Sequence, residues 1–105
     1  MPARKDIDSI IGFHAQQATE KWLKTLLLTR NVTFNKKHDI DYLIELLEND
    51  GLELPIDADS LIALTVYAVP MRYDELLDTE PLDRDATVAL VDEVGSWAEV
   101  ETRDS

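Results

Sequence analysis

The chain of 105 residues is predicted to fold as an all-α protein, an antiparallel bundle of about four helices. Two observations predict this class. Apolar residues recur at spacings of three and four in four segments, and helix start and stop signals separate those segments. In addition, no window alternates between apolar and polar residues for long enough to predict a strand. We therefore expect one helical domain that spans residues 1–105.

The first expected helix runs from about Asp6 or Asp8 to Thr29, with Asp8 or Ser9 as its N-cap. Its apolar residues fall on one face when each residue turns the helix by about 100°. That face consists of Ile11, Ala15, Ala18, Trp22 and Leu26, and it is widened by Leu23 and Leu27.

Gln16 is a polar residue that projects between Leu23 and Leu27 of this helix. An amide in that position is expected to be buried or at an interface, where it needs hydrogen-bond partners, and we expect a bond between helices. Glu20 follows one turn later and Lys24 one turn after that. Glutamate followed by lysine at this spacing supports a helix.

The second expected helix begins near Asp39, after a loop over residues 30–37, and His38 or Asp39 is its cap. Gly51 is the expected stop, because glycine readily adopts the left-handed conformation that ends helices. The apolar face of this helix is Ile40, Leu43, Ile44 and Leu47.

A third helix, capped by Asp57 or Asp59, is expected to continue to Ala68 and to end before Pro70. The fourth is expected to begin with Pro81 in its first position and to reach about Val100. Residues 101–105 should fray. The fourth helix is expected to bury Val88, Val91, Val94, Trp97 and Ala98.

The charge is strongly acidic, with 22 Asp and Glu against 10 Lys and Arg and a net charge of −12. Such a protein repels nucleic-acid phosphates, so we expect no extended nucleic-acid surface. One segment, residues 21–37, is basic, and it can be read as a solvated helix end or as an anion site. Its basic residues are Lys21, Lys24, Arg30, Lys36 and Lys37.

The absence of cysteine excludes disulfides and thiolate metal sites, and it fits a reducing cytoplasm. The sequence has no signal-peptide pattern, no apolar run that could span a bilayer, no metal-binding motif and no glycine-rich phosphate loop. We therefore expect a cytoplasmic protein without membrane contact, metal or cofactor.

The segment FHAQQATEKWLKTLL over residues 13–27 is followed by Lys37-His38-Asp39-Ile40 and later by Met71-Arg72-Tyr73. In that order these segments resemble the HEPN domain family, and the resemblance covers roughly residues 11–75. It implies a helical bundle. HEPN proteins usually carry another helix ahead of the first segment, whereas only about a dozen residues precede it here. Either the bundle is a short variant, or the leading helix is missing, which would expose an apolar groove that a partner subunit fills. A homodimer through the first helix, the fourth helix or both is the expected assembly.

The family includes endoribonucleases that use an arginine followed four to six residues later by histidine. No histidine follows Arg72, Arg30 or Arg84 at that spacing. We therefore assign no catalytic residue and expect no ribonuclease activity. The alternatives are an endoribonuclease toxin with an altered active site built on Arg72 and His38, or a purely structural dimerisation module. His14 is expected to be solvated or to lie between subunits.

Arg72 and Tyr73 also resemble the branch of the family that is encoded beside a minimal nucleotidyltransferase, although Asp74 stands where that branch commonly has proline. The resemblance implies an accessory or binding protein in a toxin–antitoxin-like pair. A nucleotide or another phosphate compound is the expected ligand. The expected ligand-binding residues are Lys21, Lys24, His38 and Arg72, and the expected buried polar or interface residues are Gln16, Gln17, Glu20 and Tyr73.

Overall fold

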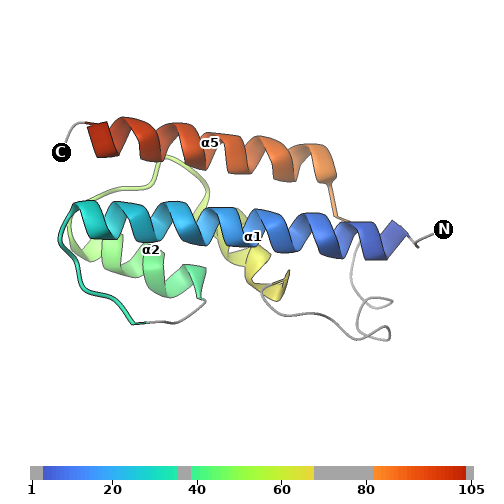
Figure 1. Cartoon of the computed structure of the whole chain (residues 1–105), viewed down its shortest axis with the longest axis horizontal. Coiled ribbons are helices and arrows are strands. Elements are labelled where there is room, and N and C mark those ends of the chain that lie inside the picture. Colours follow the sequence, from blue (N-terminus) through green and yellow to red (C-terminus); the bar gives the residue numbers. More distant parts are fainter. Residues whose placement is uncertain (1–3, 36–38, 68–81, 104–105) are drawn as a thin grey trace.

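A computed structural model describes residues 4–35, 39–67 and 82–103 of the chain. The predicted all-α class is confirmed, because the described residues form helices and turns and contain no strand. The helices in chain order are α1 (Arg4–Thr29), α2 (Ile40–Asn49), α3 (Ala58–Ile62), the 3₁₀ helix η1 (Ala63–Tyr67) and α5 (Arg84–Arg103) (Figure 1).

The helix directions differ from the expected antiparallel bundle. Arg30 Nε donates to Asp50 Oδ2 at 2.6 Å, which joins the C-terminal ends of α1 and α2. Asp8 and Arg84 join the N-terminal ends of α1 and α5. These three helices therefore run in the same sense (Figure 1). The connection between α1 and α2 is long enough to allow this direction. Residues 30–39 can extend over about 33 Å, and they have to run back by only the length of α2, about 15 Å.

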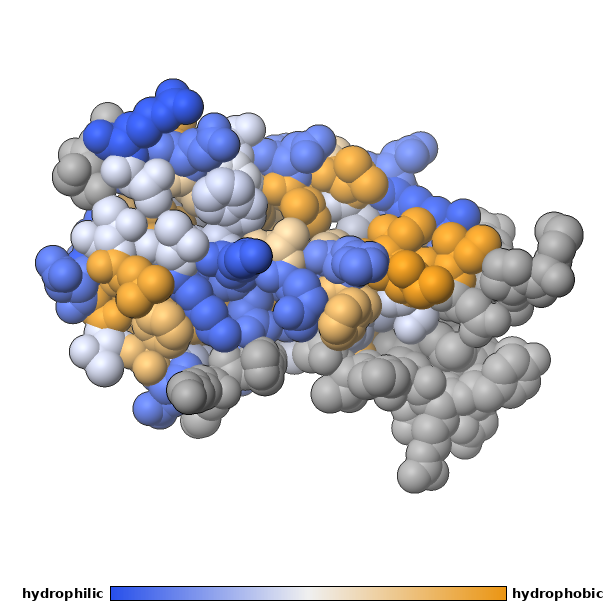
Figure 2. All heavy atoms as spheres, in the orientation of Figure 1, coloured by the Kyte–Doolittle hydropathy of each residue, from blue (hydrophilic) through white to orange (hydrophobic). Residues whose placement is uncertain are grey.

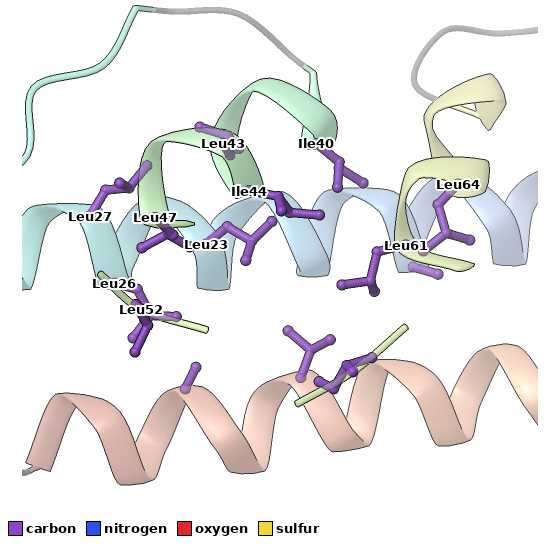
Figure 3. Packing of buried hydrophobic residues seen from close by; sticks show 14 residues of the cluster. Leu23, Leu26, Leu27, Ile40, Leu43, Ile44, Leu47, Leu52, Leu61 and Leu64 are labelled. Atoms are coloured by element: carbon purple, nitrogen blue, oxygen red, sulfur yellow. The ribbon is translucent and has the colours of Figure 1, made fainter. Parts of the chain in front are cut away.

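The core lies where α1 meets α2, α3 and α5. Leucine and isoleucine side chains of α1, α2 and α3 point toward one another there (Figure 3), and α5 contributes Val94 and Ala98. Leu23 and Leu27 of α1 are fully buried, as the helical wheel predicted. So are Leu43 and Leu47 of α2, and Leu61 of α3 closes the same cluster. The long α1 therefore supplies the central surface on which the shorter elements pack.

Caps define the ends of the two short helices as predicted. The Asp39 side chain accepts from the backbone N–H of Asp41 at 3.1 Å, and the Asp57 side chain accepts from Asp59 at 3.2 Å. Gly51 ends α2 with a φ of 91°. These short acidic caps satisfy amides that the first helical turn leaves unpaired.

The boundaries of α5 differ from the prediction. It begins at Arg84, because Asp83 Oδ1 accepts from the backbone N–H of Ala86 at 3.0 Å and acts as the cap. Pro81, the predicted first residue, lies outside the described residues, as do Ala68 and Pro70 at the predicted end of the third helix. At its other end α5 continues to Arg103 rather than fraying from residue 101.

Two further predictions about side chains were wrong. Val88 of α5 is 54% exposed, whereas Val94 and Ala98 of the same helix are buried as expected and Val91 and Trp97 are half-buried. Asp8 is not an N-cap, because α1 begins at Arg4 and Asp8 lies inside the helix with its side chain buried. The extra turn ahead of Asp8 allows its carboxylate to reach α5 instead of its own backbone amides.

Candidate functional site

Four polar side chains form a hydrogen-bonded row along α1, which we call the polar ladder: Gln17, Gln16, Glu20 and Lys24. Gln17 Nε2 donates to Gln16 Oε1 at 2.9 Å, and Gln16 Nε2 donates to Glu20 Oε2 at 2.7 Å. Lys24 Nζ donates to the other oxygen, Glu20 Oε1, at 2.6 Å. The spacing of four residues places Gln16, Glu20 and Lys24 one above another on the helix surface.

The middle of the ladder is buried and its far end reaches solvent. Gln16 is 0% exposed and Glu20 is 3% exposed, whereas the Lys24 side chain is 24% exposed. The prediction that Gln16 is buried and hydrogen-bonded is confirmed. The prediction that Gln16 bonds to another helix was wrong for its described partners. Both of them, Glu20 and Gln17, lie on α1, the helix that carries Gln16.

The ladder leaves two polar groups with unused hydrogen-bonding capacity at the surface. An ammonium has three N–H donors, and Lys24 uses one of them in its hydrogen bond to Glu20. The Gln17 amide donates one N–H to Gln16 and retains a second N–H and a carbonyl. Lys24 follows Gln17 by seven residues, so their Cα atoms lie about 10 Å apart along one helix face.

The other predicted site residues are only partly described. Lys21 is exposed on α1 and makes no hydrogen bond to the ladder among the described residues. His38, Arg72 and Tyr73 lie outside the described residues, so their place in a ligand site stays a prediction. His14 is exposed, as expected, and its ring meets the Phe13 ring edge-on with centroids 5.9 Å apart.

A second polar cluster, which was not predicted, joins the starts of α1 and α5. The Asp8 carboxylate is 6% exposed, and it accepts from Arg84 Nε at 2.7 Å and from the backbone N–H of Leu82 at 3.0 Å. Burial, and secondarily the nearby Asp8 charge, raises the pKa of Tyr67 above its ordinary value. The contact of Asp8 with α5 could not be predicted from the sequence, because an aspartate near a helix start is usually a cap.

Among the hollows that border α5, two lie beside η1 or α1. One, of about 430 Å³, lies between η1 and the first turns of α5 and includes Tyr67 and Leu82 in its lining. The other, of about 330 Å³, is a groove between α1 and α5, and we call it the α1–α5 groove. Hydrophobic side chains gather on the face over these two helices (Figure 2). The groove is lined by Ile11, His14, Ala15, Ala18, Thr87, Val88, Val91 and Asp92.

Within residues 4–35, 39–67 and 82–103, no group of three or more His, Asp or Glu side chains is arranged to hold a metal ion. None of the described helices is long and apolar enough to cross a membrane.

The chain matches the protein-family model described as HEPN domain, and the match covers residues 4–101. That span includes the polar ladder, the α1–α5 groove and the whole of α2, α3 and η1. No curated protein and no solved structure gave a match.

Proposed function

This chain belongs to the HEPN domain family, and from that premise we propose that it is a non-catalytic binding subunit that holds a nucleotide on the polar ladder. The observation that carries the proposal is the ladder itself. Gln16 and Glu20 place an amide and a carboxylate inside a small helical domain, where apolar residues would be less costly to bury. The two ends of the ladder, Gln17 and Lys24, retain unused donors and an acceptor.

A nucleotide fits these two ends better than inorganic phosphate does. The Lys24 ammonium supplies two N–H donors to a phosphate, while the Gln17 amide can pair with the edge of a base, as glutamine does with adenine. The separation of about 10 Å along the helix calls for a ligand with a phosphate at one end and a base at the other. Glu20 lies beside Lys24 and opposes an anion that makes no other contact, which favours a ligand bound at both ends.

Titrations of ATP and of pyrophosphate against the purified chain test this proposal. We expect Lys24→Ala to weaken ATP binding about tenfold, and Arg103→Ala, which removes an exposed cation on α5, to leave it unchanged. Gln17→Leu should weaken ATP binding but not pyrophosphate binding. Equal affinities of the wild type and Lys24→Ala for ATP would refute the proposed site. Lys21→Ala, His38→Ala and Arg72→Ala show whether the remaining predicted residues contribute.

We further propose that the biological partner is a minimal nucleotidyltransferase-type protein, with which the chain forms a toxin–antitoxin-like pair. The resemblance at Arg72 and Tyr73 supports this partner. Co-expression with a nucleotidyltransferase encoded beside this chain should give a complex that co-purifies through a tag on either protein. RNA cleavage by the purified chain, lost in Arg72→Ala, would instead favour a ribonuclease with an altered site.

A further inference from the structure

An exposed aromatic side chain continues the face of the polar ladder toward the start of α1. Phe13 is 38% exposed, and it precedes Gln17 by four residues, so the two side chains are neighbours on the helix surface. Lys24 follows Phe13 by eleven residues, which returns the chain to within about 20° of the same direction around the helix. An aromatic ring, an amide and an ammonium therefore follow one another along one face of α1.

The Phe13 ring has a fixed neighbour in His14. The centroids of the two rings lie 5.9 Å apart and their planes make an angle of 69°, which is the edge-on contact that aromatic pairs favour. Ile10, one turn earlier, is 57% exposed, and hydrophobic side chains gather on this part of the surface (Figure 2). Phe13 is thus an oriented ring in apolar surroundings, and part of it is open to solvent.

The charges around Lys24 limit what a phosphate alone gains there. The chain has a net charge of −12, so its field repels anions at long range. Glu20 Oε1 accepts from Lys24 Nζ at 2.6 Å and offsets part of the attraction between this ammonium and a phosphate. A bound nucleotide therefore needs a strong contact at its base. Stacking on an aromatic ring supplies an attraction that does not depend on net charge, because every base has a π face.

We propose that Phe13 is the stacking platform for the base of the nucleotide assigned to the polar ladder, and this role rests on that assignment. The base lies flat on the exposed part of the ring, its edge pairs with the Gln17 amide, and its phosphates extend toward Lys24. Gln17 retains the N–H and the carbonyl with which a glutamine pairs with adenine. A two-ring base covers more of the Phe13 ring than a one-ring base does, so the preferred ligand is a purine nucleotide, and adenine fits best.

Calorimetric titrations of ATP, UTP and tripolyphosphate against the purified chain test the platform. Phe13→Leu keeps an apolar side chain but removes the aromatic face, so we expect it to weaken ATP binding about tenfold and to leave tripolyphosphate binding unchanged. Phe13→Trp keeps an aromatic face and should bind ATP at least as tightly as the wild type does. The wild type should bind ATP more tightly than UTP, and Phe13→Leu should reduce that difference.

Leu28→Ala is the matched control, because Leu28 is an apolar residue of α1, 66% exposed, that lies one turn beyond Lys24. It should leave the affinity for ATP unchanged. A stacked base is detected directly with 2-aminopurine riboside triphosphate, whose fluorescence falls when the base stacks. We expect this quenching with the wild type and with Phe13→Trp but not with Phe13→Leu. The Phe13 variants replace a partly exposed side chain, so both should retain the helical circular dichroism of the wild type.

The same titrations separate failure of the platform from failure of the nucleotide site. If Lys24→Ala binds ATP as tightly as the wild type, the site on the polar ladder is wrong and the platform is wrong with it. If ATP binding requires Lys24 and Gln17 but is equal in the wild type, Phe13→Leu and Phe13→Trp, only the stacking role of Phe13 is overturned. A change in sedimentation of Phe13→Leu with unchanged affinity for ATP would instead assign this side chain to a protein interface.

Discussion

At the scale of single residues, the interior of this small bundle contains polar side chains whose hydrogen bonding differs sharply. Gln16 is hydrogen-bonded through both its amide nitrogen and its carbonyl. Thr19, one turn away and equally buried, has a hydroxyl with no hydrogen-bond partner among the described residues. The same core therefore holds one polar group that contributes to stability and another that reduces it.

We expect Gln16→Leu to lower the free energy of unfolding by about 1–3 kcal/mol, because Glu20 Oε2 loses a donor inside the core. Gln17→Leu is the matched variant, and it should cost less than 1 kcal/mol, since Gln17 is half-buried and water can replace it at Gln16. Urea unfolding followed by circular dichroism measures both. Equal losses would mean that the buried part of the ladder has no special role in stability.

Thr19→Val should raise the free energy of unfolding by about 1 kcal/mol, because it removes a buried hydroxyl without a partner and keeps the shape of the side chain. Thr87→Val provides the contrast. The Thr87 hydroxyl is buried too, but it donates to the Asp83 carbonyl at 2.7 Å, so its removal should cost about 1 kcal/mol. Thermal melts of the two variants should shift in opposite directions, and a fall in both would contradict this assignment.

At the scale of secondary-structure elements, acidic caps determine where the helices begin. Asp39, Asp57 and Asp83 each accept a backbone N–H at the start of a helix. The Asp83 cap explains why α5 begins at Arg84, since the side chain and the backbone carbonyl of Asp83 both receive hydrogen bonds from the first turn.

Replacing Asp83, the cap of α5, should lower the free energy of unfolding more than replacing Asp85, the acidic residue in the first turn. We expect Asp83→Ala to lower the free energy of unfolding by about 1 kcal/mol, because the Ala86 amide loses its acceptor. Asp85→Ala removes only a favourable charge in the first turn and should cost about 0.3–0.5 kcal/mol. Chemical unfolding at low salt ranks the pair, and a larger loss for Asp85→Ala would exclude Asp83 as the cap.

At the scale of the whole molecule, long-range polar contacts align the first and last helices. The cluster of Asp8, Arg84 and the Leu82 amide joins α1 to α5 across more than 70 positions of sequence. Tyr67 of η1 packs on the same end of α1, so that a side chain at Gly12 would lie 2.5 Å from the Tyr67 ring.

Asp8→Ala should lower the free energy of unfolding by about 2–3 kcal/mol, because it leaves the Leu82 amide and the Arg84 guanidinium without this acceptor. Asp50→Ala breaks an ion pair of similar length, Arg30 with Asp50, but both side chains there are about one-third exposed. It should cost less than 1 kcal/mol. Denaturant titrations of the two variants compare a buried contact with an exposed one, and similar losses would argue against the Asp8 cluster as a structural joint.

The raised pKa of Tyr67 predicts weaker folding in alkali. Burial first, and the Asp8 charge second, disfavour the ionised phenol in the folded state. The unfolded chain then loses its proton near pH 10 while the folded chain keeps it, so stability should fall as the pH rises above about 10. In Tyr67→Phe this part of the decline should disappear, whereas Tyr42→Phe should retain it. Unfolding curves between pH 8 and pH 11 provide the comparison.

Short-range patterns were enough to predict much of this architecture. The period of apolar residues identified the buried face around Leu23 and Leu27, and local chemistry identified the Asp39 cap and the Gly51 stop. The same periodicity placed Gln16 in the interior. Each of these features depends on residues a few positions apart.

Features that depend on distant residues could not be predicted in the same way. Asp8 resembles a cap until α5 brings Arg84 beside it, and the exposure of Val88 depends on how α5 is rotated against α1. Helix direction depends on the path of the connections, which periodicity does not encode. The polar ladder was predicted as separate residues, but its hydrogen bonds required the rotamers that the structure shows.

The shared direction of α1 and α5 has an electrostatic consequence. The peptide dipoles of a helix amount to roughly half a positive charge at its start and half a negative charge at its end, and antiparallel neighbours cancel them. Here the two longest helices begin at the same end, so their dipoles add (Figure 1). Asp8 brings a carboxylate to that positive end, whereas Arg103 carries its cation to the opposite, negative end of α5. These two side-chain charges are opposite in sign to the helix ends they approach, so they offset part of the summed dipole and stabilise an arrangement in which no antiparallel helix does so.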